Sequence, residues 1–307
     1  MRPDIAEFAD KVALHAMNRR IPASLEGSYQ TSLSFEAVLA GTEVNGVKTA
    51  VTQLAAPGVH PIWLHTPSGE IACRVKVHLA ADPEAPLLIY HHGLGEYPYD
   101  SSWRRLFGNG RATPFPMHRV LIQAPYHANW RDPLDKGFES LQSIYQMLAG
   151  SLRIMELVQD FFTGQGTAYT VVTGVSWGGI TSVLYEGVFQ RSRAVIPMLS
   201  SPNIGQAIWD IAELVARPLT ISHNELLTLL DFTPYYQRIN GADVYPLLGA
   251  QDLFFRQEHH APLFGTRPLR LIPGSHISNL WQIKPLREHL YHVLSAIENR
   301  SPHPTHS

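Results

Sequence analysis

The sequence predicts an α/β fold in which a mostly parallel sheet is flanked by helices. From residue 86 onward, short continuous apolar runs replace an earlier alternating pattern. Such runs are typical of parallel strands buried on both faces. Segments with helical periodicity separate the runs. A chain of 307 residues is long enough for one large α/β domain, with or without an insertion.

The first part of the chain predicts a helical extension followed by antiparallel strands. We assign residues 1–45 to the extension, where four apolar residues recur at helical spacing: Ile5, Phe8, Ala9 and Val12. Residues 47–54 are predicted to form a strand. Residues 71–79 alternate between apolar and polar side chains and include Cys73, which indicates a half-buried strand.

Residues 46–202 and 241–300 are predicted to form the α/β core. Six apolar runs are the expected core strands: 87–90, 120–122, 169–173, 194–196, 244–248 and 269–272. Helices are expected over residues 141–158 and 286–297. Pro246 fits poorly in the fifth run, because proline has no N–H to donate to a neighbouring strand.

Residues 203–240 show two helical patterns and no strand. The second pattern begins at Ser222, and Glu225 three residues later completes a capping box. We interpret the segment as a helical cap over the carboxyl edge of the sheet. Residues 301–307 are expected to be a disordered tail.

Composition limits the classes of partner. The 24 Lys and Arg nearly balance the 26 Asp and Glu, and no long basic run occurs, so no nucleic-acid partner is expected. Charged residues make up 16% of the chain, against a usual figure of about 25%. A homo-oligomer interface or an apolar substrate cleft would each account for this deficit, and composition does not choose between them.

The expected location is the cytoplasm. Cys73 is the single cysteine, so no intramolecular disulfide is expected. The first twenty residues carry several charges and no continuous apolar segment, unlike a signal peptide. No run of eighteen apolar residues occurs, so no membrane span is expected.

Residues 174–178 read Gly-Val-Ser-Trp-Gly, a G-x-S-x-G pattern. They follow a β-branched run and precede a helical segment. This strand–turn–helix context holds a serine on a tight elbow with its hydroxyl exposed, which makes Ser176 a candidate nucleophile. Gly174 and Gly178 suit the elbow because side chains there would clash where strand and helix backbones come close.

A serine nucleophile needs a base, and the base needs a group that fixes its tautomer. In a parallel sheet, reacting groups collect at the carboxyl ends of strands. Asp252 follows the run at 244–248, and His276 follows the run at 269–272. The chain order Ser176, Asp252, His276 is the nucleophile, acid, base order of one hydrolase architecture.

An oxyanion needs two backbone N–H donors. Trp177, directly after the candidate nucleophile, is expected to supply one. The segment His-Gly-Leu-Gly at 92–95 follows a strand, and Leu94 is the candidate for the other donor. Gly93 and Gly95 would let the backbone approach a substrate.

No metal or cofactor is expected. The pair His259 and His260 is interpreted as surface histidines rather than as metal ligands, because no third ligand stands at a suitable spacing.

Together, the motifs at 92–95, 174–178, 249–252 and 274–276 resemble the α/β-hydrolase superfamily over residues of about 70 to 300. The resemblance implies an eight-stranded, mostly parallel sheet with a cap, and acyl transfer to water through a covalent ester on Ser176. It excludes the branches with an aspartate nucleophile, such as haloalkane dehalogenases and epoxide hydrolases.

The expected activity is hydrolysis of a small, partly apolar carboxylic ester. A peptidase, thioesterase, C–C bond hydrolase or lyase would use the same triad and stays open, as does a hydrolase fold that binds a ligand without turning it over. Eight aromatic residues are expected near the cleft, more than half of them as packing: Tyr97, Tyr99, Trp130, Trp177, Trp209, Phe232, Tyr235 and Tyr236.

Overall fold

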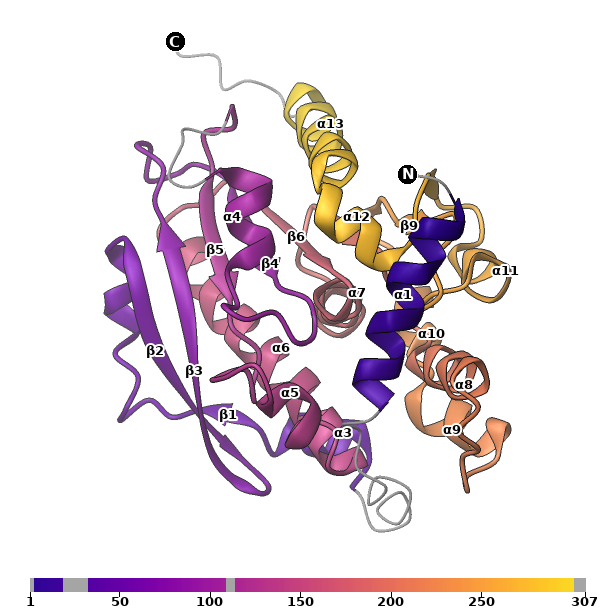
Figure 1. Ribbon diagram of the computed structural model, residues 1–307. Helices are drawn as coiled ribbons and strands as arrows, with labels where there is room; N and C mark the ends of the chain where they lie inside the picture. The colour runs from indigo at the N-terminus through magenta and orange to yellow at the C-terminus, as the bar shows by residue number, and fades with distance from the viewer. Residues whose placement is uncertain (1–2, 19–32, 109–113, 301–307) are drawn as a thin grey trace.

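The computed structural model describes residues 3–18, 33–108 and 114–300 of the chain. The described residues form one large sheet with helices on both faces (Figure 1), which confirms the predicted α/β class. The strands of this sheet are β1 (Glu43–Val44), β2 (Gly58–Thr66), β3 (Gly69–His78), β4 (Leu87–His91), β5 (His118–Ile122), β6 (Thr170–Val175), β7 (Ala194–Met198), β8 (Asp243–Val244), β9 (Leu247–Gly249) and β10 (Arg270–Ile272).

The spatial order of the strands is β1-β2-β3-β5-β4-β6-β7-β9-β10, and β8 also pairs with β7. Three pairs are antiparallel: β1 with β2, β2 with β3, and β3 with β5. All the other pairs are parallel. The sheet therefore has ten strands where the resemblance implied eight. The two-residue strands β1 and β8 account for the difference.

The predicted strand at 244–248 is divided into β8 and β9. Both pieces pair with β7, and Pro246 lies between them. Because proline has no N–H, the hydrogen-bond ladder is interrupted at this residue. The misfit noted in the sequence thus marks the place where the strand breaks.

The predicted strand at 47–54 is wrong. Asn45 turns the chain there, since its side-chain Oδ1 accepts the N–H groups of Val47 and Lys48. Val47 is 97% exposed, and a short 3₁₀ helix follows at Val51–Ala55. The strand that pairs with β3 is β2 instead, which the sequence analysis missed.

The described α-helices are α1 (Pro3–Asn18), α3 (Phe35–Ala40), α4 (Ser101–Phe107), α5 (Asp132–Asp135), α6 (Leu141–Gly164), α7 (Trp177–Phe189), α8 (Ile204–Leu214), α9 (His223–Leu230), α10 (Thr233–Gln237), α11 (Gln257–His260), α12 (His276–Gln282) and α13 (Lys284–Arg300). The predicted helices at 141–158 and 286–297 correspond to α6 and α13. None of the described helices combines the length and the apolar character needed to cross a membrane.

Two apolar cores lie on opposite faces of the sheet. In β4, Leu87 and Ile89 belong to the core shared with α6 and α7, whereas Leu88 and Tyr90 belong to the core shared with α4 and α13. This alternation follows from the period of two along a strand. The continuous apolar runs of the sequence therefore reflect burial on both faces.

Within residues 203–240 the structure has three helices, α8, α9 and α10, where the sequence predicted two. The capping box of Ser222 and Glu225 is present at the start of α9. The helices α8 and α9 pack against each other. The interpretation of this segment as a cap stays a prediction.

The N-terminal helix α1 packs against α12 (Figure 1). Its apolar residues Ile5, Phe8 and Val12 are exposed, so helical spacing alone did not identify the packed side of the helix. The inward side carries mostly small or apolar residues and one carboxylate: Ala6, Ala9, Asp10 and Leu14. The predicted tail at 301–307 lies outside the described residues.

Candidate active site

Ser176 lies at the junction between β6 and α7. Its φ of 53° is in the left-handed region that non-glycine residues rarely adopt. The Ser176 N–H donates to the Met198 carbonyl in β7 at 2.8 Å, and the Ser176 carbonyl accepts the Gly179 N–H at 2.9 Å. These bonds hold the strained turn on both sides of the residue.

Close backbone contacts require glycine at both ends of the elbow. A Cβ on Gly174 would lie 2.3 Å from the Gly178 carbonyl carbon. A Cβ on Gly178 would lie 2.0 Å from the carbonyl oxygen of His91 at the end of β4. Both distances are far below van der Waals contact, so the start of α7 packs directly on backbone.

Asp252 and His276 meet at the same edge of the sheet. Asp252 follows β9 and His276 follows β10, and Asp252 Oδ2 lies 2.9 Å from His276 Nδ1. Both side chains are almost fully buried. The other oxygen, Asp252 Oδ1, accepts the N–H groups of Phe254 and Phe255, which fixes the carboxylate against its own loop.

Burial of the His276 ring disfavours its charged form, while the negative charge of Asp252, their hydrogen bond and the charge of Asp10 favour it. The net effect raises the pKa of His276 above its ordinary value of 6.5. The ring of Phe254 stacks on the imidazole with centroids 4.5 Å apart. The histidine is thus held on one edge by a carboxylate and on one face by an aromatic ring.

Leu94 and Trp177 each present a backbone N–H without an acceptor in the described part of the chain. The neighbouring N–H groups are engaged: Gly93 donates to Glu96, and Gly95 donates to His127. Gly93 lies beside the elbow, because a Cβ on it would be 3.5 Å from Ser176 Cβ.

Glu96 is a titratable group of this region that the sequence analysis missed. Its carboxylate accepts the N–H of Gly93 at 2.7 Å and the N–H of Ser102 at 2.8 Å. Burial raises the pKa of Glu96 to about 7, although these backbone donors oppose the shift. It therefore anchors the 92–95 loop through the N–H of Gly93.

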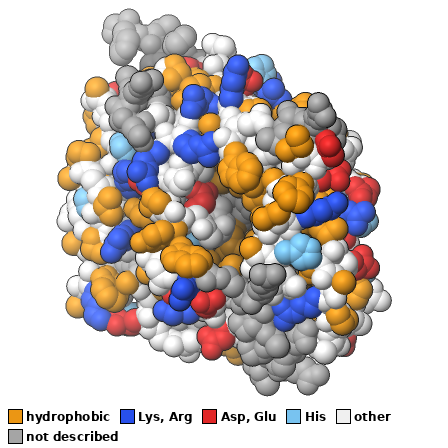
Figure 2. Space-filling view, in the orientation of Figure 1, with side chains coloured by type: hydrophobic (Ala, Val, Ile, Leu, Met, Phe, Trp, Pro, Cys, Tyr) orange, Lys and Arg blue, Asp and Glu red, His pale blue; other side chains and the backbone are white. Residues whose placement is uncertain are grey.

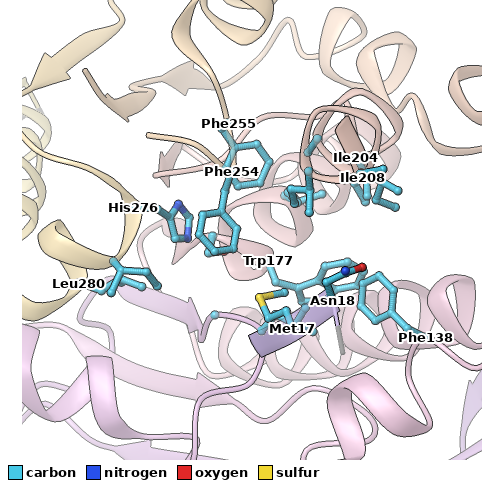
Figure 3. A pocket seen from close by; sticks show the side chains of 18 of the residues that line it. Met17, Asn18, Phe138, Trp177, Ile204, Ile208, Phe254, Phe255, His276 and Leu280 are labelled. Carbon is cyan, nitrogen blue, oxygen red and sulfur yellow. The ribbon is translucent and has the colours of Figure 1, made fainter. Parts of the chain in front are cut away.

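Ser176 and His276 line one cavity of about 170 Å³, together with Leu94, Trp177 and Glu96. Most of the other lining side chains are apolar, and Figure 3 shows Ile204 and Ile208 across from Trp177 and Phe138. Figure 2 shows hydrophobic side chains gathered near the middle of the face seen in Figure 1. Within the described residues no hydrogen bond joins Ser176 to His276.

The architecture is shared with solved enzyme structures. An acetyl xylan esterase from Paenibacillus sp. R4 matches with a TM-score of 0.53 at 12% identity, over 86% of this chain and 92% of the other. A putative lipase from Acinetobacter baumannii AYE matches with a TM-score of 0.50 at 12% identity, over 88% of this chain and 98% of the other. The chain has the α/β-hydrolase fold. No protein-family model matches the sequence, and no curated protein matches it.

Most of the aromatic side chains that line the cavity of this α/β-hydrolase fold were not predicted from the sequence. Of the eight that the sequence analysis named, Trp177 lines the cavity. Three aromatic residues that were not predicted also line it: Phe138, Phe254 and Phe255. Phe254 and Phe255 could have been noticed, because they lie two and three residues after the predicted acid in the chain.

The interpretation of His259 and His260 as surface residues is wrong for His260. That side chain is fully buried, and His259 is partly exposed and hydrogen-bonded to Asp210 in α8 at 2.8 Å. Burial lowers the pKa of His260 to about 4, which keeps it neutral at pH 7. Among the described residues no group of three His, Cys, Asp or Glu side chains is arranged to hold a metal ion.

We predict that Gly178→Ala destabilises the protein by about 1–3 kcal/mol or more, because the new Cβ would overlap the His91 carbonyl oxygen. The loss would occur although alanine is the better helix former by about 1 kcal/mol. Chemical denaturation measures the change. Gly164→Ala at the end of α6 is the matched control, since nothing lies within 4 Å of its Cβ position. Equal stability of the two variants would contradict the close contact.

Proposed function

We propose that the protein is a serine hydrolase that cleaves a carboxylic ester of a small, partly apolar substrate. The observation that carries the proposal is that Ser176, with its strained backbone, lines the same cavity as His276. The Nδ1 atom of His276 is hydrogen-bonded to the buried carboxylate of Asp252. The two solved neighbours bear the names of an acetyl xylan esterase and a putative lipase, which agrees with ester chemistry.

In the proposed reaction, His276 Nε2 accepts the Ser176 hydroxyl proton while Oγ attacks the ester carbonyl carbon. The negative charge of Asp252 stabilises the resulting imidazolium. The C–O bond to the alcohol then breaks, and His276 returns the proton to the departing alcohol. A water molecule repeats the sequence on the acyl ester of Ser176, which releases the carboxylic acid and restores the serine.

The tetrahedral oxyanion would accept hydrogen bonds from the backbone N–H groups of Leu94 and Trp177. Hydrogen bonds hold Gly93 and Gly95 on either side of Leu94 and Ser176 before Trp177, so the donors are in place before the reaction and need little rearrangement. Enzymes without bound substrate often lack the hydrogen bond between nucleophile and base, because catalytic hydrogen bonds often tighten when the substrate binds.

The lining of the cavity favours an apolar group on the substrate. Five residues of α8 contribute small or branched aliphatic side chains: Ile204, Ala207, Ile208, Ile211 and Ala212. Each methylene buried there would contribute about 0.8 kcal/mol to binding. We therefore place the apolar part of the substrate against α8.

Ser176→Ala is expected to abolish turnover of short p-nitrophenyl esters and labelling by a fluorophosphonate probe, because both need the Oγ nucleophile. The fold should persist, as judged by circular dichroism. Ser68→Ala, at an exposed position in the β2–β3 turn, is the control and should behave as wild type. A folded wild type that neither labels nor cleaves esters, thioesters, amides or β-diketones would favour a binding protein over an enzyme.

The pH profile of kcat/KM should have an acidic limb with a midpoint above 6.5, because His276 must be neutral to act as base and its pKa is raised. Activity would be lost as the pH falls through that midpoint. Initial rates with a p-nitrophenyl ester from pH 5 to 9 test this. A midpoint clearly below 6.5 would contradict the coupling of His276 to Asp252.

Ile208→Trp is expected to reduce kcat/KM for the longest accepted acyl or alcohol chains by about 10-fold or more, with little change for acetate esters. The larger ring would fill the cavity beside α8, and a displaced methylene or two is worth roughly 1–3 kcal/mol. An ester chain-length series measures the effect. Leu214→Trp on the same helix is the control, because Leu214 is partly exposed and does not line the cavity.

A further inference from the structure

Asp10 is a fully buried carboxylate in α1 that touches the backbone of both predicted triad loops. Its Oδ2 accepts the N–H of Leu253 at 3.0 Å and the N–H of His276 at 3.1 Å. Its Oδ1 accepts the N–H of Ile277 at 2.8 Å. A single side chain from the start of the sequence thus binds two segments that lie more than two hundred residues further on.

These contacts favour the ionised form of Asp10. A carboxylate is only an acceptor, and three backbone N–H groups match that chemistry. Two of the donors belong to the first turn of α12, where the helix dipole also favours a negative charge. Burial and then the charge of Asp252 raise the pKa of Asp10 above its ordinary value, and His276 and the backbone donors of Leu253 and Ile277 oppose this shift.

The positions of the three donors link Asp10 to the proposed base and acid. Leu253 directly follows Asp252, and His276 is itself one of the residues bound. Asp10 therefore connects the loop after β9 to the start of α12 by accepting backbone N–H groups from both. The 2.9 Å contact between Asp252 and His276 spans the same two segments.

Asp10 also adds a second negative charge near the imidazole. The ionisable groups that face His276 are Asp252 from the β9 loop and Asp10 from α1. Glu96 lines the same cavity. Of these, Asp252 and Asp10 stabilise the imidazolium form of His276.

The far end of α1 reaches the cavity itself. Met17 and Asn18 line it (Figure 3), and Arg217 after α8 donates to the carbonyl and to the side-chain oxygen of Asn18. The helix is thereby attached at its middle, through Asp10, to the predicted triad loops, and at its C-terminal end, through Asn18, to Arg217 after α8. Its place along the cavity is fixed at two points.

We propose that Asp10 is a positioning residue for the reaction: its carboxylate holds the backbone of the Asp252 and His276 loops in register and, through its charge, supports the protonated state of His276. The inference rests on the proposed hydrolase function. It assigns to the N-terminal helix a part in the chemistry, although no atom of Asp10 needs to touch the substrate.

Asp10→Asn is the first test, because it keeps the size of the side chain while it removes the charge and places an N–H₂ group among N–H donors. We expect kcat to fall on the order of 10- to 100-fold, as a small displacement of reacting groups can cause. KM should change by less than about 3-fold, since Asp10 does not line the cavity. The acidic limb of the pH profile should move to lower pH.

Asp4→Asn is the matched control, with the same chemical change at an exposed position of the same helix. It should leave kcat, KM and the pH profile unchanged. Rates are divided by the concentration of sites that a fluorophosphonate probe labels, so that a lower folded fraction does not count as lower activity. Unchanged kcat and pH midpoint per labelled site in Asp10→Asn would overturn the proposal.

An NMR titration of His276 gives a readout that needs no turnover. The His276 ring signal is identified by its loss in His276→Gln, and its pKa is compared between wild type and Asp10→Asn. We expect a lower pKa in the variant, and an equal pKa would overturn the electrostatic part. If the wild type cleaves no ester, the hydrolase proposal fails while this titration still decides the role of Asp10.

Asp10→Glu serves if Asp10→Asn does not fold. It keeps the charge but lengthens the side chain, so the pKa of His276 should stay raised while kcat still falls because the backbone contacts are displaced. A Glu variant with wild-type kcat would show that the spacing of Asp10 from the two loops does not matter, which would overturn the positioning role.

Discussion

The close approach of the first turn of α7 to the end of β4 is the constraint on which the site depends. At Gly178 the helix backbone lies against the carbonyl oxygen of His91, with no room for a side chain. That contact and the strained φ of Ser176 have one origin, since the chain must reverse within a single residue between strand and helix. The same contact brings the loop that follows His91 beside Ser176, and this loop includes the Leu94 N–H, which has no acceptor among the described residues. This single packing contact therefore places both the proposed nucleophile and the proposed oxyanion donors.

Burying charge next to this elbow is costly unless each charged oxygen has a partner. Asp252 meets the condition with two backbone donors and the His276 ring. Asp10 meets it with three backbone donors. Burial raises the pKa of Asp10, and repulsion between the two carboxylates raises it further. A protonated His276 relieves this repulsion, so both carboxylates favour the imidazolium that the proposed reaction forms transiently.

The sequence could predict features whose cause is local. The contact between the elbow glycines Gly174 and Gly178, the capping box at Ser222 and the continuous apolar strands follow from contacts between near neighbours in the chain or from burial of a whole strand. The turn at Asn45 was also local, and its Asx chemistry was overlooked in favour of the apolar run after it. Asp10 was out of reach for a different reason. A charged residue on a helix is normally solvated, and only the tertiary structure shows three donors from distant loops around it.

In the N-terminal helix α1, the helical spacing of apolar residues did not identify the side that packs against the protein, and the packing of this helix gives the reason. Ile5, Phe8 and Val12 are exposed, while the packed side is built from small residues that let α1 come close to α12. Close approach is what allows so short a side chain as Asp10 to reach backbone N–H groups on its neighbour. A larger apolar residue at Ala6 or Ala9 would bury more surface but would lift the helix away from those donors. The composition of the packed side is therefore better explained by polar contact than by hydrophobic burial, and the same helix contacts the His276 backbone and lines part of the apolar cavity.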